Sequence, residues 1–147
     1  PDLSGYDYAL QRQLKPEPPT KYQKILSELK IIPTSMIDIS DGLSSEALHI
    51  SKSSKVGVCL HEDKIPVDHT VMNMASEFNL NPIAFALSGG EDYELLFTIN
   101  QKDYEKLKKD PDFTIVGYVT DISEGNNFIA SDGSSHKLTS QGWDSTK

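Results

Sequence analysis

The chain of 147 residues has a single cysteine, Cys59, and a shortage of basic side chains. One cysteine cannot form an internal disulfide bond, so a reducing compartment, and therefore a cytoplasmic location, is expected. Only 14 lysines and arginines stand against 22 acidic residues, which gives a net charge of −8. Nucleic acids and anionic membranes bind basic surfaces, so neither is expected as a partner, whereas a cation-binding site is compatible with this charge.

Long apolar runs and the common nucleotide-binding loops are also missing. No apolar run approaches the ~20 residues of a membrane-spanning helix, and the amino terminus does not resemble a signal peptide. Neither the P-loop pattern, Gly-x-x-x-x-Gly-Lys-Ser/Thr, nor the Rossmann pattern, Gly-x-Gly-x-x-Gly, occurs. The hydrophobic content of 37% nevertheless indicates a globular chain, and its length is typical of one domain.

Hydrophobic periodicity predicts an α+β fold, with a mixed sheet of four to five strands covered by helices. Residues 2–14 are expected to form a helix, and the prolines within 15–19 predict a connector between this helix and a domain of residues 20–147. Further helices are expected at 20–30, 42–53, 68–78, 83–87 and 101–109, and strands at 37–39, 56–60, 95–99, 112–119 and 128–130.

The stretch Met36-Ile-Asp-Ile-Ser-Asp-Gly-Leu43 places two carboxylates and a hydroxyl where a strand becomes a helix. Asp38, Ser40 and Asp41 are expected at the carboxyl end of the strand, beside the free backbone N–H groups of the helix. Carboxylates there can cap the helix, or they can hold a hard cation such as Mg²⁺ next to a phosphate at the helix start. One carboxylate suffices for a cap, so the pair favours the metal, with capping as the alternative.

A second informative stretch is Ser88-Gly-Gly-Glu-Asp-Tyr-Glu-Leu95. Gly89 and Gly90 permit a tight turn or a close approach of the backbone to a ligand, and three acids, beginning with Glu91, follow within four positions. Crowded like charges repel unless something neutralises them. The alternative is an ordinary helix end, a loop and a solvated strand start. Trp143, the sole tryptophan, is either a packing anchor or a stacking surface for a ligand.

These two stretches, together with Gly-Trp-Asp at 142–144, resemble the carboxyl-terminal half of the thiamine-monophosphate kinase family. That family is related to aminoimidazole-ribonucleotide synthetase, selenophosphate synthetase and a hydrogenase-maturation protein. The resemblance implies a fold like the carboxyl-terminal domain of the synthetase. It also implies transfer of the γ-phosphoryl group of ATP to thiamine monophosphate, giving thiamine diphosphate, with the help of Mg²⁺.

The resemblance further implies which residues contact which ligand. Asp38 and Asp41 correspond to Mg²⁺ ligands, and Ser40 corresponds to a nucleotide contact. Glu91 and Trp143 correspond to substrate contacts, with backbone contacts expected from Gly89 and Gly90. No residue of this chain is assigned a catalytic role of its own.

The chain also departs from the family. The amino-terminal domain, which supplies most nucleotide and Mg²⁺ ligands and the homodimer interface, has no counterpart in these residues, so the chain alone is expected to be inactive. Its first residue is Pro1 and not Met, which is expected of a fragment or a processed chain. Glu46-Ala47 stands where the family usually has Asp-Leu. Two alternatives remain: a related ATP-using enzyme with another acceptor, and a domain that binds a ligand without catalysis.

Overall fold

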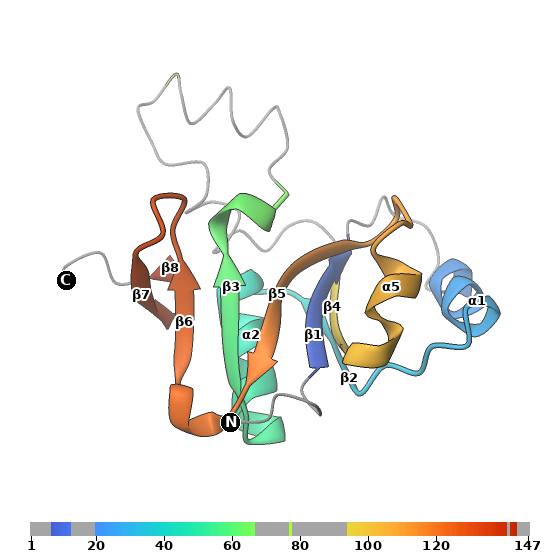
Figure 1. The fold of residues 1–147 in the computed structure, drawn as a ribbon, viewed down its shortest axis with the longest axis horizontal. Helices are drawn as coiled ribbons and strands as arrows, with labels where there is room; N and C mark the ends of the chain where they lie inside the picture. The colour runs from blue at the N-terminus through green and yellow to red at the C-terminus, as the bar shows by residue number, and fades with distance from the viewer. Residues whose placement is uncertain (1–6, 13–19, 67–76, 78–93, 141, 144–147) are drawn as a thin grey trace.

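The computed structural model describes residues 7–12, 20–66, 77, 94–140 and 142–143 (Figure 1). Within this part of the chain, eight strands form one sheet in the order β2-β4-β1-β5-β3-β6-β7-β8. The strands are β1 (Asp7–Arg12), β2 (Ser35–Ile39), β3 (Gly57–His61), β4 (Glu94–Asn100), β5 (Thr114–Thr120), β6 (Asn126–Ile129), β7 (Ser135–Thr139) and β8 (Gly142–Trp143). The α-helices are α1 (Thr20–Glu28), α2 (Leu43–Ser54) and α5 (Tyr104–Leu107), and the 3₁₀ helices are η1 (Glu62–Lys64), η2 (Gln101–Asp103) and η3 (Ile122–Glu124).

The α+β class is confirmed, because helices cover a sheet that contains both kinds of strand pairing. Only β3 and β6 pair in parallel among the described strands, and the other six pairings are antiparallel. The sheet is larger than the four to five strands expected, since β1, β7 and β8 add to the predicted ones. The helices expected at 68–78 and 83–87 lie outside the described residues, apart from Glu77.

The helix predicted for residues 2–14 is wrong over Asp7–Arg12, which form the strand β1. This strand lies inside the sheet and pairs antiparallel with β4 on one side and β5 on the other, so that Tyr8 lies opposite both Ile99 and Tyr118. Hydrogen bonds on both edges outweigh a helical spacing of apolar residues that the isolated segment also offers. The segment before residue 20 therefore contributes a central strand to the domain.

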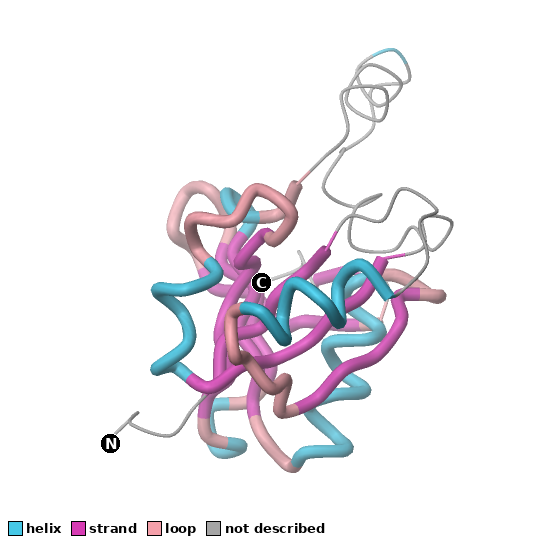
Figure 2. Tube along the Cα trace, turned by 90° about the vertical axis from the view of Figure 1, so that its right-hand side faces the viewer, coloured by secondary structure: helices cyan, strands magenta, loops and turns pink. Residues whose placement is uncertain are grey.

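The helices cover both faces of the sheet (Figure 2). Alternation along β4 sends Leu96 into the core cluster that includes Leu43, Ala47 and Ile50 of α2. Phe97 belongs to the opposite cluster, to which α1 contributes Leu26 and α5 contributes Leu107. Both Leu96 and Phe97 are almost completely buried, so this strand is apolar on its two faces. The outermost described strand at this end of the sheet is β2, and α2 packs against it.

Candidate functional site

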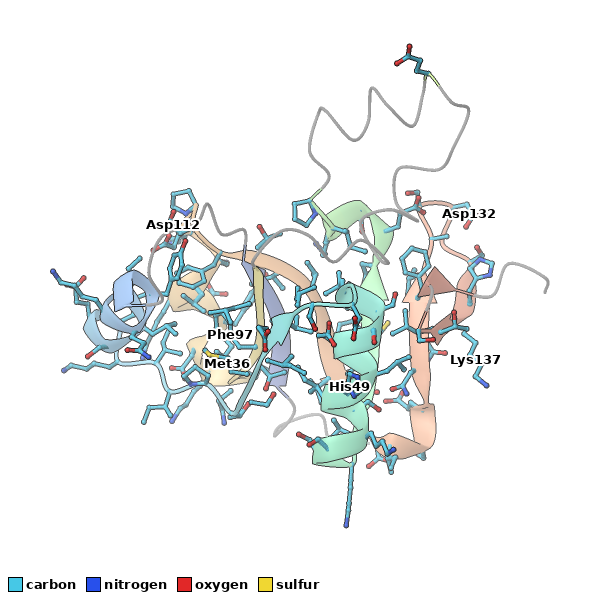
Figure 3. All side chains as sticks on the ribbon, turned by 180° about the vertical axis from the view of Figure 1, so that it is seen from behind. Met36, His49, Phe97, Asp112, Asp132 and Lys137 are labelled. Carbon is cyan, nitrogen blue, oxygen red and sulfur yellow. The ribbon has the colours of Figure 1, made fainter. Side chains whose placement is uncertain are left out.

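A hollow of about 730 Å³ is lined by residues of β2, of the turn after it and of α2. The residues that line it include Asp38, Ser40 and Asp41, so the structure brings together the three residues of the first predicted stretch. Met36 of β2 and His49 of α2 also line the hollow and are labelled in Figure 3. Other lining residues are Ser35, Ile37, Glu46, Ile50, Lys52, Ser53 and Ser54.

The strand β2 delivers Asp38 to the surface because its side chains alternate. Met36 and Asp38 are exposed, whereas Ile39 is buried in the core that α2 covers. Ile39 pairs with Glu94, the first residue of β4. The middle of the first stretch therefore lies beside the end of the second, although Gly89, Gly90 and Glu91 themselves lie outside the described residues.

Within the described ranges, no side-chain hydrogen bond is made at the N-cap of α2. Its N-cap is Gly42, which has φ 112° and makes no side-chain capping hydrogen bond. A positive φ of this kind favours glycine, which explains the glycine between Asp41 and Leu43. Among the described residues, no hydrogen bond or ion pair engages the carboxylate of Asp38 or Asp41. The structure thus gives the capping alternative no support, and both exposed carboxylates remain available to a ligand.

The pair of carboxylates suits Mg²⁺ by the chemistry of its donors. Magnesium prefers oxygen ligands and usually takes one or two carboxylates, with water and substrate phosphates completing its coordination. The described part of the chain holds no group of three His, Cys, Asp or Glu side chains that would enclose a metal by itself. Two carboxylates can hold such an ion only together with water or a phosphate.

Sequence reasoning missed the role of Glu46, which lies in the first turn of α2. Its side chain is buried, with 2% of the residue exposed, and its Oε2 atom accepts hydrogen bonds from the backbone N–H groups of Ser40 at 3.0 Å and Asp41 at 2.9 Å. The Nε2 atom of His49 lies 3.9 Å from Oε1 of the same carboxylate. An acid in the first helical turn was the available signal, because such acids often bond to free N–H groups.

Trp143 lies at the other edge of the sheet. Its backbone belongs to β8, which pairs with β7 so that Trp143 lies opposite Leu138. Among the described strands β2 and β8 are the two outer ones, so the backbones of Asp38 and Trp143 lie in strands at opposite ends of the sheet order.

The single cysteine is not part of the site. Cys59 is free and buried in β3, and burial raises the pKa of its thiol. The side chain of Tyr118 forms a hydrogen bond with that of Cys59, and this bond is the main cause that raises the pKa of Tyr118 to about 12. Both groups are neutral at ordinary pH, and a buried neutral thiol is a poor nucleophile.

The sequence is similar to those of known kinases. The thiamine-monophosphate kinase of Pyrococcus horikoshii is 39% identical over 121 residues, which make up 82% of this chain and 36% of the relative. The chain thus spans little more than a third of the length of that relative. No protein-family model matches the chain.

Solved structures share the fold. The structure of AaThiL complexed with AMPPCP and TMP matches with a TM-score of 0.66 at 24% identity, over 94% of this chain and 50% of that one. The structure of HypE from E. coli, a hydrogenase maturation protein, matches with a TM-score of 0.71 at 16% identity, over 93% of this chain and 50% of that one. These likenesses confirm the fold expected from the aminoimidazole-ribonucleotide synthetase resemblance. The chain is therefore related to the thiamine-monophosphate kinases, and it fits their carboxyl-terminal domain.

Proposed function

We propose that the protein containing this chain transfers the γ-phosphoryl group of ATP to thiamine monophosphate and releases thiamine diphosphate. The observation that carries the proposal is the pair of exposed carboxylates, Asp38 and Asp41, just before the start of α2, in a chain that is 39% identical to such a kinase over 121 residues. AaThiL, which shares this fold, is known in complex with AMPPCP and TMP, and this supports a nucleotide and a thiamine phosphate as the two substrates.

The chemistry of phosphoryl transfer explains why these residue types suffice. The reaction needs little covalent help from the protein, but it needs the two phosphate groups to be aligned and their charges neutralised. When bound, Mg²⁺ supplies that neutralisation. Asp38 and Asp41 would hold the ion, and Ser40 between them would contact the nucleotide. The carboxylates thereby orient the phosphates without themselves taking a proton.

The remaining parts of the enzyme would come from outside this chain. The relatives are more than twice as long, and we infer that an amino-terminal domain supplies the other nucleotide and Mg²⁺ ligands and the interface of a homodimer. A cytoplasmic location is supported by the single free cysteine. Among the described residues, no helix is long and apolar enough to cross a membrane.

A second candidate is an ATP-using enzyme of the same fold with a different acceptor. The match in fold to HypE, with a TM-score of 0.71, is the observation that favours it. The identity to HypE is only 16%, whereas the identity to the Pyrococcus horikoshii kinase is 39%. Substrate preference follows the side chains of a site and not its fold, so thiamine monophosphate is the preferred acceptor.

The proposed substrate contact of Trp143 can be tested by replacing it with alanine in the two-domain protein, meaning this chain joined to the amino-terminal domain. A cation–π contact with the thiazolium ring contributes roughly 0.5–2 kcal/mol, so Trp143→Ala should weaken thiamine monophosphate binding by a factor of about two to thirty. Glu91→Gln should also weaken the binding of thiamine monophosphate, because the Glu91 carboxylate is proposed to accept hydrogen bonds from the aminopyrimidine ring. Calorimetric titration of each ligand separately gives the two affinities.

ATP affinity is the internal control for this experiment, since neither residue is proposed to touch the nucleotide. Selective loss of thiamine monophosphate binding supports the assignment. Equal losses for both ligands would show that Trp143 is a packing anchor of the β7–β8 pair, and the substrate contact would have to be sought elsewhere.

A further inference from the structure

We propose that Glu46 is a positioning residue that fixes the turn carrying the proposed Mg²⁺ and nucleotide contacts, and that it acts through hydrogen bonds and not as a metal ligand. This inference rests on the proposed function of Asp38, Ser40 and Asp41, and it deepens that function. It concerns a side chain that sequence patterns alone mark only as a departure from the family.

The geometry ties one carboxylate oxygen to two consecutive residues of the turn. Oε2 of Glu46 accepts from the N–H of Ser40 at 3.0 Å and from the N–H of Asp41 at 2.9 Å. Hydrogen bonds to an ionised acceptor are stronger than those between neutral groups. Two such bonds to adjacent peptide units fix both the position and the direction of this backbone, and therefore the starting points of the Ser40 and Asp41 side chains.

The turn at residues 40 and 41 needs these hydrogen bonds because it lies outside the strand and the helix and its side chains are not packed. Residues 40 and 41 follow the last residue of β2 and precede Gly42, whose φ of 112° directs the chain into α2. Ser40 and Asp41 are exposed, so packing does not hold their side chains. Glu46 comes from the first turn of α2, where the backbone is held by the helix and by the N–H of Glu46 bonded to the carbonyl of Gly42 at 3.1 Å. The helix thus acts as the rigid base from which the turn is held.

The burial of Glu46 distinguishes its proposed positioning role from the proposed metal-binding role of Asp38 and Asp41. Only 2% of Glu46 is exposed, whereas Asp38 and Asp41 are exposed. Removing the Glu46 carboxylate would leave the two N–H groups without their acceptor, which favours another backbone arrangement of the turn. The effect on Mg²⁺ and ATP would be indirect, through displacement of Asp41 and Ser40.

The test compares Glu46→Ala with Glu46→Gln in the two-domain protein. Alanine removes both hydrogen bonds, and the apparent affinity for Mg²⁺ should fall about tenfold to a hundredfold at saturating ATP. Glutamine keeps a carbonyl oxygen that can accept from both N–H groups, so Mg²⁺ affinity should stay within about threefold of the wild type. The KM for thiamine monophosphate should be unchanged in both variants, because its proposed contacts are Glu91 and Trp143.

Ser51→Ala is the matched control for loss of stability. Ser51 is a buried residue of the same helix, and its hydroxyl bonds to the carbonyl of Val56 at 2.6 Å and to Oδ1 of Asn126 at 2.9 Å, away from the turn. This variant should lower the melting temperature without changing Mg²⁺ dependence. An equal loss of Mg²⁺ affinity in Glu46→Ala and Ser51→Ala would overturn the proposal, because it would reveal a purely structural effect. A loss in Glu46→Gln as large as that in Glu46→Ala would also overturn it, because glutamine keeps the accepting oxygen and the two hydrogen bonds would then not be the cause of the loss.

Amide hydrogen exchange of this chain tests the geometry independently of any kinase activity. The amides of Ser40 and Asp41 should exchange at least about tenfold faster in Glu46→Ala than in the wild type, and at the wild-type rate in Ser51→Ala. Unchanged exchange in Glu46→Ala would overturn the positioning role. If the exchange result holds but the wild-type two-domain protein shows no kinase activity, the proposed function fails and the local role of Glu46 stands.

Discussion

Replacement of Asp38 or Asp41 by alanine in the two-domain protein is expected to lower Mg²⁺-dependent kinase activity by about a hundredfold or more, with little change in melting temperature. The loss is large because a metal ion contributes several kcal/mol to a phosphoryl-transfer step, and each ~1.4 kcal/mol is a factor of ten in rate. The stability change is small because both side chains are exposed and Gly42, not either aspartate, is the helix N-cap. Initial rates over a Mg²⁺ titration and a thermal melt of each variant provide the two measurements.

Asp112→Ala is the matched control for this prediction. Asp112 is an exposed aspartate labelled in Figure 3, and it does not line the hollow beside α2. Its replacement changes the net charge by the same amount and should leave the Mg²⁺ dependence as in the wild type. Normal activity in both Asp38→Ala and Asp41→Ala would remove these residues from the metal site. A large fall in melting temperature with normal activity would return them to a structural role.

Gly117→Ala is expected to destabilise the fold by about 3 kcal/mol or more, at the upper end of the usual cost of overpacking. A Cβ atom at Gly117 would overlap the backbone carbonyl oxygen of Cys59 and lie 3.1 Å from the Cα atom of Leu60. These atoms belong to β3, which pairs with β5 at this position, so relief requires the two central strands to separate. Chemical denaturation followed by circular dichroism measures the loss.

Gly133→Ala is the comparison that isolates the steric effect. Gly133 has φ 86°, so an alanine there is strained by about 1–2 kcal/mol, but its Cβ meets no described atom within 4 Å. Gly117→Ala should therefore cost clearly more than Gly133→Ala. Equal costs would mean that β3 and β5 do not approach each other as closely as the structure has them.

The parts of the fold that the sequence predicts well have a local signal. Leu43, Ala47 and Ile50 repeat at helical spacing, and all three are buried against the sheet in α2. The short apolar run at 95–99 predicts the strand β4, and residues 96–99 of that strand are buried. In these segments the period of the apolar residues agrees with the tertiary environment.

The missed strands lack such a signal. In residues 7–12 the spacing of Tyr8 and Leu10 fits a strand, whereas Leu10 and the flanking Tyr6 and Leu14 fit a helix, and pairing with β4 and β5 decides between them. The strand β7 has a single buried apolar residue, Leu138, so it shows no alternation that could be recognised. Both outcomes depend on partners far away in sequence, which a local pattern does not contain.

In the candidate site, too, a local pattern predicts some residues and misses others. Asp38, Ser40 and Asp41 could be predicted together because they are nearly contiguous and lie at a strand–helix junction. The hydrogen bonds of Glu46 could not, because they depend on how the chain bends between Ser40 and α2, where Gly42 has φ 112°. The opposite placement of β2 and β8 in the sheet likewise depends on the whole topology and not on any one motif.

The most direct test of the proposed thiamine-monophosphate kinase activity is a product assay with the two-domain protein, ATP, Mg²⁺ and thiamine monophosphate. Separation of the thiamine compounds by chromatography should show thiamine diphosphate formed in equal amount to ADP, and addition of a chelator should abolish both products. Formation of ADP without thiamine diphosphate would assign the ATP chemistry to another acceptor. If the folded two-domain protein formed neither ADP nor thiamine diphosphate, the proposed kinase activity would be contradicted.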